Sequence, residues 1–262
     1  MQSGRSLKQQ LLPSPFVIGN TFMSCLIVKE KNIPVRISQN SMTRNRNNAK
    51  IQPVLGGACT RIVPQSAGQT AKACRLPSFY MTNTRSIKKK LNEFSAQSTT
   101  SGVDVGVITE SWLHSYIDCV YISIPGYVLY RRDRPDREGS GVRAFVTIGI
   151  TCKRKTDLEH PVFKCIGLWL RPHQLPRPLS GIICGIVYFP EALAQENRDR
   201  VSYLIETQDS VRSAHPDCGV IICGDFKTSD FSEVLVHHNL KQIVRDPTRG
   251  NSILDLILTD IF

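Results

Sequence analysis

The feature that most limits how this chain can fold is a succession of short apolar segments with little helical pattern among them. The segments are LPSFYMTN, VDVGVITE, YVLYRRD, GVRAFVTIGI, VFKCIGLWL, SGIICGIVYFP, GVIICGD and SILDLILTD. Clusters of Pro, Gly and charged residues separate them, as loops separate β-strands. A doubly wound parallel sheet needs a helix after nearly every strand, and residues 120–190 show no helical spacing. The pattern therefore predicts an α/β fold in which two sheets pack face to face, with helices outside.

Three stretches have the spacing of helices that bury one face. In residues 84–94, TRSIKKKLNEF, the apolar residues Ile87, Leu91 and Phe94 fall at i, i+4 and i+7. Residues 191–215 and 231–238 are predicted to form a long helix and a short one. The chain has neither a Walker loop nor a GxGxxG motif, so no small-molecule cofactor is predicted.

The positive charge of the chain is concentrated near its N-terminus. Residues 1–74 hold ten Lys and Arg against a single acid, a balance of +9 out of the net +11. This segment is rich in Ser, Gln and Asn, so we expect a basic, mostly disordered arm before a folded domain over residues 75–262. The arm could contact a polyanion such as nucleic acid, be a solvated tail without a partner, or be a transit peptide. Its apolar patch, residues 15–28, is shorter than the roughly 20 residues of a membrane span, so no membrane association is predicted.

The pattern of the nine cysteines indicates the redox state of the cellular compartment in which the chain is expected. Their number is odd and no pair has CxxC spacing, which fits neither a disulfide framework nor a zinc site. Several lie inside apolar runs such as IICGIV and VIICGD, which is typical of buried thiols. We therefore expect a reducing, intracellular location, nuclear or cytoplasmic. The sequence does not predict an oligomeric state.

Four predicted strands close on a residue that can bind a metal ion or handle a proton. These residues are Asn83, Glu110, Tyr188 and Asp225. A polar residue often ends a strand without having a function, but four such ends fit a single site at one end of a sandwich.

Phosphodiester hydrolysis is the chemistry that needs this set of residues. A hard cation, Mg²⁺ or Mn²⁺, prefers carboxylates, waters and phosphate oxygens as ligands. Glu110 would therefore hold the ion, and Asn83 could bind the ion or help to orient it through its side-chain amide. Asp225 would position the attacking water, and Tyr188 would donate a hydrogen bond to a phosphate oxygen. The metal and the donors would then stabilise the charge that builds on phosphorus.

Six motifs, in their order and spacing, make residues 76–262 resemble the endonuclease/exonuclease/phosphatase superfamily, and most closely the apurinic-type endonuclease domain of non-LTR retrotransposons. The motifs are NTRSIKKKLNEF, VGVITESWL, GSGVRAFV, GIVYFP, IICGDF and IVRDPTRGNSILDLILTD. The resemblance implies a four-layer α/β/β/α sandwich that nicks DNA, with the four strand-end residues in the roles given above. It adds Asp255 as the acid beside the family's catalytic histidine, and it implies that arginines such as Arg85 and Arg249, otherwise solvated surface, lie along DNA phosphates.

The chain departs from the family pattern in two places. Lys227 stands where the family has Asn in a GDFN motif, and its charge is expected to weaken Mg²⁺ binding, although a lysine can also contact a phosphate. The family continues beyond Asp255 to a Ser-Asp-His segment, whereas this sequence ends at Phe262. We therefore expect a C-terminally incomplete domain that lacks its last strand and the proton-handling histidine.

The sequence thus predicts a Mg²⁺-dependent DNA endonuclease of retrotransposon origin whose activity is impaired. One alternative is a non-catalytic remnant that binds nucleic acid. Another is a phosphatase of the same superfamily that acts on inositol phosphates or lipids, although the segment DPTRGNSILDLILTD favours the retrotransposon branch.

Overall fold

The computed structural model of the chain describes the backbone of Cys25–Val28 and residues 75–84, 86–87, 90–113, 116–133, 141–191, 193–227, 229–249 and 251–261. Apart from Cys25–Val28, the predicted arm over residues 1–74 lies outside the described residues, and its disorder stays a prediction. None of the helices in the described ranges is long and apolar enough to cross a membrane.

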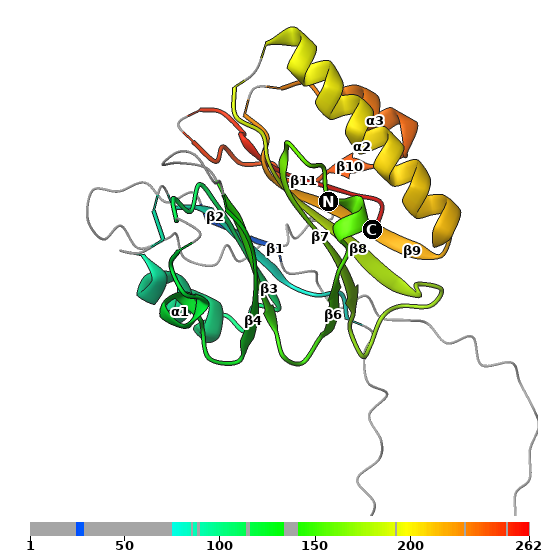
Figure 1. Ribbon diagram of the computed structural model, residues 1–262. Coiled ribbons are helices and arrows are strands. Elements are labelled where there is room, and N and C mark those ends of the chain that lie inside the picture. Colours follow the sequence, from blue (N-terminus) through cyan, green and yellow to red (C-terminus); the bar gives the residue numbers. More distant parts are fainter. Residues whose placement is uncertain are drawn as a thin grey trace, which may run out of the picture.

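Two β-sheets form the centre of the molecule (Figure 1). The first sheet has the order β1 (Cys25–Val28), β2 (Phe79–Asn83), β3 (Val105–Thr109), β5 (Val142–Thr147), β4 (Tyr127–Arg132). The second has the order β10 (Lys241–Gln242), β11 (Asp255–Thr259), β9 (Cys218–Asp225), β8 (Gly181–Tyr188), β7 (Lys164–Arg171), β6 (Thr151–Arg154). Among the strands that the structure describes, only the pairs β2–β3 and β8–β9 are parallel, and the other neighbouring strands are antiparallel. Each sheet therefore contains one parallel pair whose carboxyl ends lie at the same edge.

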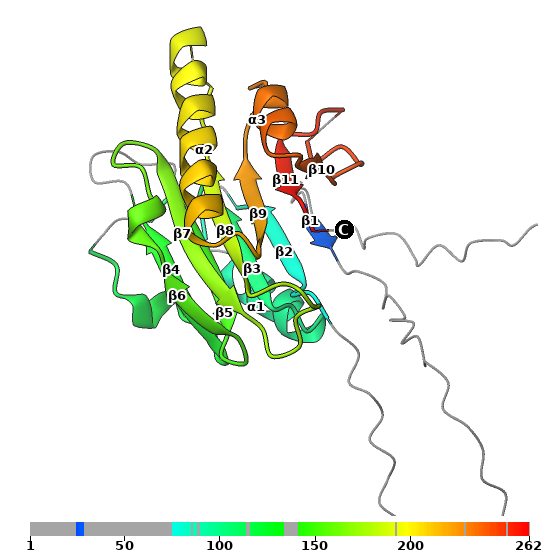
Figure 2. The same cartoon turned by 90° about the vertical axis from the view of Figure 1, so that its right-hand side faces the viewer.

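Helices cover the outer face of each sheet, which makes four layers. Helix α1 (Leu91–Thr100) lies on the first sheet, and α2 (Ala194–Ala214) and α3 (Ser232–His237) lie on the second (Figure 1). In the view turned by 90°, α2 and α3 stand side by side over the second sheet (Figure 2). Two short 3₁₀ helices, Cys119–Ile122 and Thr156–Leu158, complete the described elements. The prediction of an α/β/β/α sandwich is confirmed.

Strand β8 shows why an unbroken apolar run suits the second sheet. Ile182, Cys184 and Ile186 point into the core between the two sheets. The alternate residues Ile183 and Val187 point to the other face and pack under the helices. Successive side chains of a strand leave on opposite faces, so a strand covered on both faces needs apolar residues throughout.

The helix predicted over residues 84–94 begins later, at Leu91, and continues to Thr100. Ser86 has φ of 140°, which no helix accommodates, and the backbone N–H of Ile87 donates to the carbonyl of Ser111 (3.1 Å). Ile87 and Phe94 are nonetheless buried in one cluster, so the apolar spacing predicted their burial correctly and the helix start wrongly.

Gly224 is a position in the second sheet that cannot take a side chain without strain. Its φ is 151°, and a Cβ built there would lie 1.8 Å from the carbonyl oxygen of Val187 on β8. Gly185, in the same sheet, would place a Cβ 3.8 Å from Ile222, which is ordinary contact. Glycine at 224 therefore permits the close approach of β8 and β9 beside Asp225.

We predict that Gly224→Ala lowers the free energy of unfolding by about 3 kcal/mol or more, because backbone strain and a backbone clash add. Gly185→Ala is the matched control and is expected to change it by less than about 1 kcal/mol. Urea unfolding followed by circular dichroism measures both. Equal midpoints for the two variants would contradict this account of Gly224.

Candidate active site

The carboxyl ends of the two parallel strand pairs meet at one end of the sandwich. Asn83 is the last residue of β2, and Glu110 directly follows β3. Tyr188 and Asp225 are the last residues of β8 and β9 and face each other in register. The side-chain amide of Asn83 donates to Oδ2 of Asp225 (2.9 Å), which joins the first sheet to the second at this point.

Lys227 lies at the centre of this group. Its ammonium nitrogen is 2.8 Å from Oε1 of Glu110 and 2.8 Å from Oδ2 of Asp225. It also lies 5.8 Å from the centroid of the Tyr188 ring, within the range of a cation–π contact. The structure thus brings Asn83, Glu110, Tyr188 and Asp225 together, with Lys227 bonded to both carboxylates.

The backbone around the site is held in an uncommon conformation. Glu110, Trp112 and Lys227 have φ of 52°, 49° and 53°. The backbone N–H of Lys227 donates to Oδ1 of Asp225 (3.2 Å), which closes a tight turn after β9. Left-handed φ is uncommon for residues other than glycine and several-fold enriched for asparagine, so the turn suits asparagine better than lysine.

Burial and charge pairing oppose each other in the pKa values of the three ionisable groups. Burial raises the pKa of Glu110, but the hydrogen bonds from Lys227 and Asn83 outweigh it, so the pKa is lowered. Asp225 is fully buried, and burial outweighs its contact with Lys227, so its pKa is raised. Burial lowers the pKa of Lys227, but its bonds to the two carboxylates raise it further, so the ammonium stays charged at neutral pH.

Three further residues were predicted to belong to the site: Asp255, Arg249 and Arg85. Asp255, the first residue of β11, is opposite Asp225 in the antiparallel register, and its backbone N–H donates to Oγ1 of Thr248 (3.1 Å). The charge of Arg249 contributes to the lowered pKa of Glu110, so this arginine borders the site. Arg85 lies outside the described residues, and its predicted phosphate contact stays a prediction.

Comparison with known proteins identifies the fold. No family model matches the chain, and no curated protein matches it. The endonuclease domain of TRAS1, a telomere-specific non-LTR retrotransposon, superposes with a TM-score of 0.50 at 16% identity, over 69% of this chain and 82% of that one. The AP endonuclease LMAP from Leishmania major superposes with a TM-score of 0.53 at 14% identity, over 69% of this chain and 78% of that one.

The chain shares the mixed α/β, two-sheet fold of these solved structures. At these identities the likeness establishes the fold, and the roles of the individual residues stay predictions. The donor atoms around Lys227 are the place to test for the predicted metal site.

The donor atoms have the chemistry of a Mg²⁺ or Mn²⁺ site, but their arrangement does not fit one. Two carboxylates and an amide are the ligands that such ions prefer, and Oδ1 of Asn83 is buried with no hydrogen-bond partner among the described residues. The point between Glu110 and Asp225, however, is taken by the ammonium group of Lys227. The predicted metal at Glu110 and Asn83 therefore stays a prediction, and no chemical step is assigned to it.

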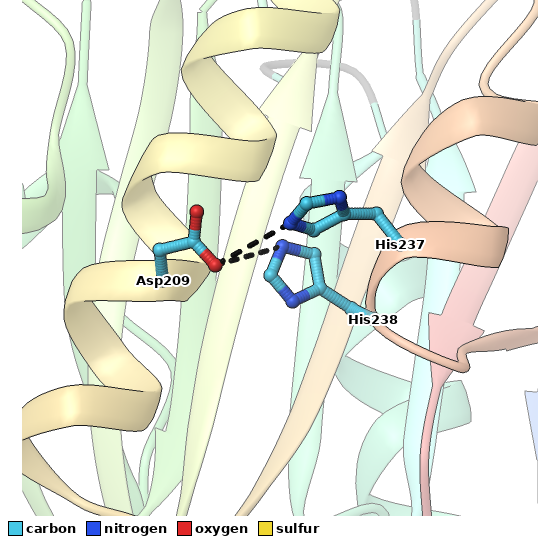
Figure 3. A group of neighbouring side chains, drawn as sticks. All are labelled: Asp209, His237 and His238. Carbon is cyan, nitrogen blue, oxygen red and sulfur yellow. Dashed lines mark ion pairs between the residues drawn. The ribbon is translucent and has the colours of Figure 1, made fainter.

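A second cluster, Asp209, His237 and His238, joins α2 to the end of α3 over the second sheet (Figure 3). In the described part of the chain it is the one group of three His, Cys, Asp or Glu side chains whose ligand atoms lie within 4.8 Å of one another. Nε2 of His237 and of His238 lie 3.5 Å and 3.9 Å from Oδ1 of Asp209. Nε2 of His238 is also 3.2 Å from the carbonyl oxygen of Ile205, which requires a proton on that nitrogen. A protonated nitrogen cannot bind a metal, so the cluster ties α3 to α2, and the sequence predicted only its helical setting.

We predict that Lys227→Met lowers the free energy of unfolding by about 3 kcal/mol, because Glu110 and Asp225 would remain buried without their cation. Lys153→Met, at an exposed position of β6, is the control and is expected to have little effect. Denaturant unfolding at neutral pH measures both variants. A Lys227→Met chain as stable as the unmodified one would show that the two ion pairs contribute nothing net.

The second cluster predicts a pH dependence. Burial, the largest cause, and the neighbouring His237 and Arg212 lower the pKa of His238 below its ordinary 6.5, against the opposing effects of the Ile205 carbonyl and Asp209. The folded chain then binds a proton less readily than the unfolded chain, so this contribution to stability is present above pH 6.5 and is lost as the pH falls below it.

The measurement is the loss of unfolding free energy between about pH 7 and about pH 5. It is expected to be smaller in His238→Asn, which keeps a donor for the Ile205 carbonyl but does not titrate. His173→Asn, at an exposed turn, is expected to leave the loss unchanged. An identical loss in the unmodified chain and in His238→Asn would contradict the prediction.

Proposed function

We propose that this chain is a phosphodiesterase-type domain that acts on DNA, with cleavage slowed by Lys227. The observation that carries the proposal is the hydrogen bond between Asn83 and Asp225, which unites the two sheet ends beside Glu110 and Tyr188. Four strand ends that share one small volume are hard to explain as separate strand-capping residues. The two proteins of similar fold described above are both named as endonucleases.

DNA is the substrate that the charges favour. Arg249 adds positive charge at the edge of the site, and residues 1–74 carry +9 by composition. Phosphate contacts by basic side chains provide most of the sequence-independent affinity of DNA-binding proteins. The motif over residues 243–260, which resembles retrotransposon endonucleases, supports the same substrate.

The residues can divide the work of hydrolysis among themselves. Asp225 can accept a hydrogen bond from the attacking water, and its raised pKa makes it a stronger proton acceptor than an ordinary carboxylate. Asn83 fixes the orientation of Asp225. Tyr188, on the adjacent strand, can donate its hydroxyl hydrogen to a phosphate oxygen.

Lys227 limits this chemistry by using the acceptor capacity of Asp225. Oδ2 accepts from both Asn83 and the Lys227 ammonium, and Oδ1 accepts from the Lys227 backbone. A carboxylate offers about four lone-pair positions, so about one is left for water. This observation also favours a second candidate function, in which the domain binds DNA without cutting it.

Two assays test the proposal. Conversion of supercoiled plasmid to open circle, with Mg²⁺ present, measures nicking, and fluorescence anisotropy of a labelled duplex measures DNA binding. The unmodified chain is expected to bind the duplex and to nick slowly. Lys227→Asn is expected to nick about tenfold faster or more, because general acid–base catalysis is commonly worth about 10²-fold or more once a base is free to act. Asp225→Ala is expected to abolish the nicking.

Lys153→Asn is the matched control, since it removes one positive charge from an exposed position outside the site. Duplex binding without any cleavage by Lys227→Asn would favour the binding-only function. If neither chain binds the duplex, the proposal of a DNA-directed domain is wrong.

A further inference from the structure

The ammonium group of Lys227 is a buried cation between two acids. The Lys227 side chain is 12% exposed, and the side chains of Glu110 and Asp225 are 10% and 1% exposed. Two carboxylates brought this close in a poorly solvated place repel each other strongly unless a positive charge lies between them. In this chain the positive charge comes from a residue of the same turn that carries Asp225.

The length of the contacts distinguishes a lysine from a metal ion. Both carboxylate oxygens are 2.8 Å from the ammonium nitrogen, the usual length of a charge-assisted hydrogen bond. Mg²⁺ holds its oxygen ligands at about 2.0–2.1 Å and tolerates little deviation from octahedral geometry. The pocket around Lys227 is therefore built to the dimensions of an ammonium group.

Several contacts hold Lys227 in this place. Its backbone N–H is bonded to Asp225, its φ of 53° directs the side chain from a tight turn, and its ammonium group lies near the Tyr188 ring. A lysine on the surface would instead leave its ammonium group in water. Moving Lys227 aside would break two ion pairs and leave Asp225, which is fully buried, without its cation.

We infer that Lys227 is the resident cation of this site: its ammonium group takes the position of the divalent metal, so the site is assembled without metal and binds metal poorly. The inference rests on the proposed function in taking these carboxylates for the reactive site. The inference specifies that this site is assembled without a metal ion. It also predicts that removing the Lys227 side chain allows a metal ion to bind there.

Asparagine is the replacement that tests this best. It suits the left-handed backbone at position 227 and supplies an amide oxygen without charge. Lys227→Asn would leave Glu110, Asp225 and two amides around the vacated point. Lys227→Arg keeps a positive charge and serves as the second variant, and Lys153→Asn controls for the change in net charge.

Two measurements that do not depend on activity form the test. The affinity for Mn²⁺ is measured by titrating the protein with Mn²⁺ and monitoring the loss of the electron paramagnetic resonance signal of the free ion. Thermal unfolding in excess EDTA and in excess MgCl₂ gives the effect of metal on stability. The unmodified chain, Lys227→Arg and Lys153→Asn are expected to bind Mn²⁺ weakly and to unfold at the same temperature in both buffers.

Lys227→Asn is expected to bind Mn²⁺ about tenfold more tightly or better, because a like charge has been removed from the site. It is also expected to unfold at a higher temperature with MgCl₂ than with EDTA, since a ligand that binds only the folded state stabilises it. Adding Glu110→Gln to this variant is expected to abolish both effects.

Tight Mn²⁺ binding by the unmodified chain that is lost in a folded Glu110→Gln chain would overturn the inference. Equal Mn²⁺ affinity of the unmodified chain and Lys227→Asn would overturn it as well. Neither result concerns DNA, so failure of this inference is distinguishable from failure of duplex binding, which would contradict the proposed function.

Discussion

A single ammonium group ties together the ends of two β-sheets that share no backbone ladder. Glu110 follows a strand of the first sheet and Asp225 ends a strand of the second, and Lys227 bonds to both. Beside these ion pairs, the amide of Asn83 reaches across to Asp225. The core between the sheets consists of apolar side chains, whose packing is strong but not directional, so directional polar contacts such as these fix how the two sheet ends are set against each other.

The apolar layers make this arrangement possible. Strands β8 and β9 are buried on both faces, which leaves their carboxyl ends as the places where polar side chains can gather. Gly224 lets β9 come close to β8 immediately before Asp225, and the following turn returns Lys227 toward the same carboxylate. The sequence order Gly-Asp-Phe-Lys therefore combines a close approach, an acid and a counter-ion within four residues.

Much of the fold was predictable because β-strands and their faces depend on local alternation and on apolar runs. The same strand ends allowed the sequence to single out Asn83, Glu110, Tyr188 and Asp225. What local pattern could not supply was the left-handed turn at Lys227 and the proximity of Glu110, more than a hundred residues earlier, so the lysine was expected to weaken metal binding and not to bridge two acids. The start of α1 was missed for a similar reason, because the backbone of Ile87 is bonded to the distant Ser111. Strand β6, short and half exposed, gave no signal against its charged surroundings.

Strand β1 gives the domain a boundary that its sequence does not suggest. Cys25–Val28 pairs with β2 in antiparallel register, although about fifty residues of polar chain separate the two strands. A protein cut at residue 75 would keep every helix and every site residue described above, but it would expose the N–H and C=O groups along one side of β2. Such an open edge can pair with the same edge of a second molecule, which is a common route to strand exchange and aggregation. With β1 in place the edge of this sheet is a four-residue strand, and without it the edge is the five-residue strand β2, so the residue at which an expressed domain begins decides which strand borders solvent.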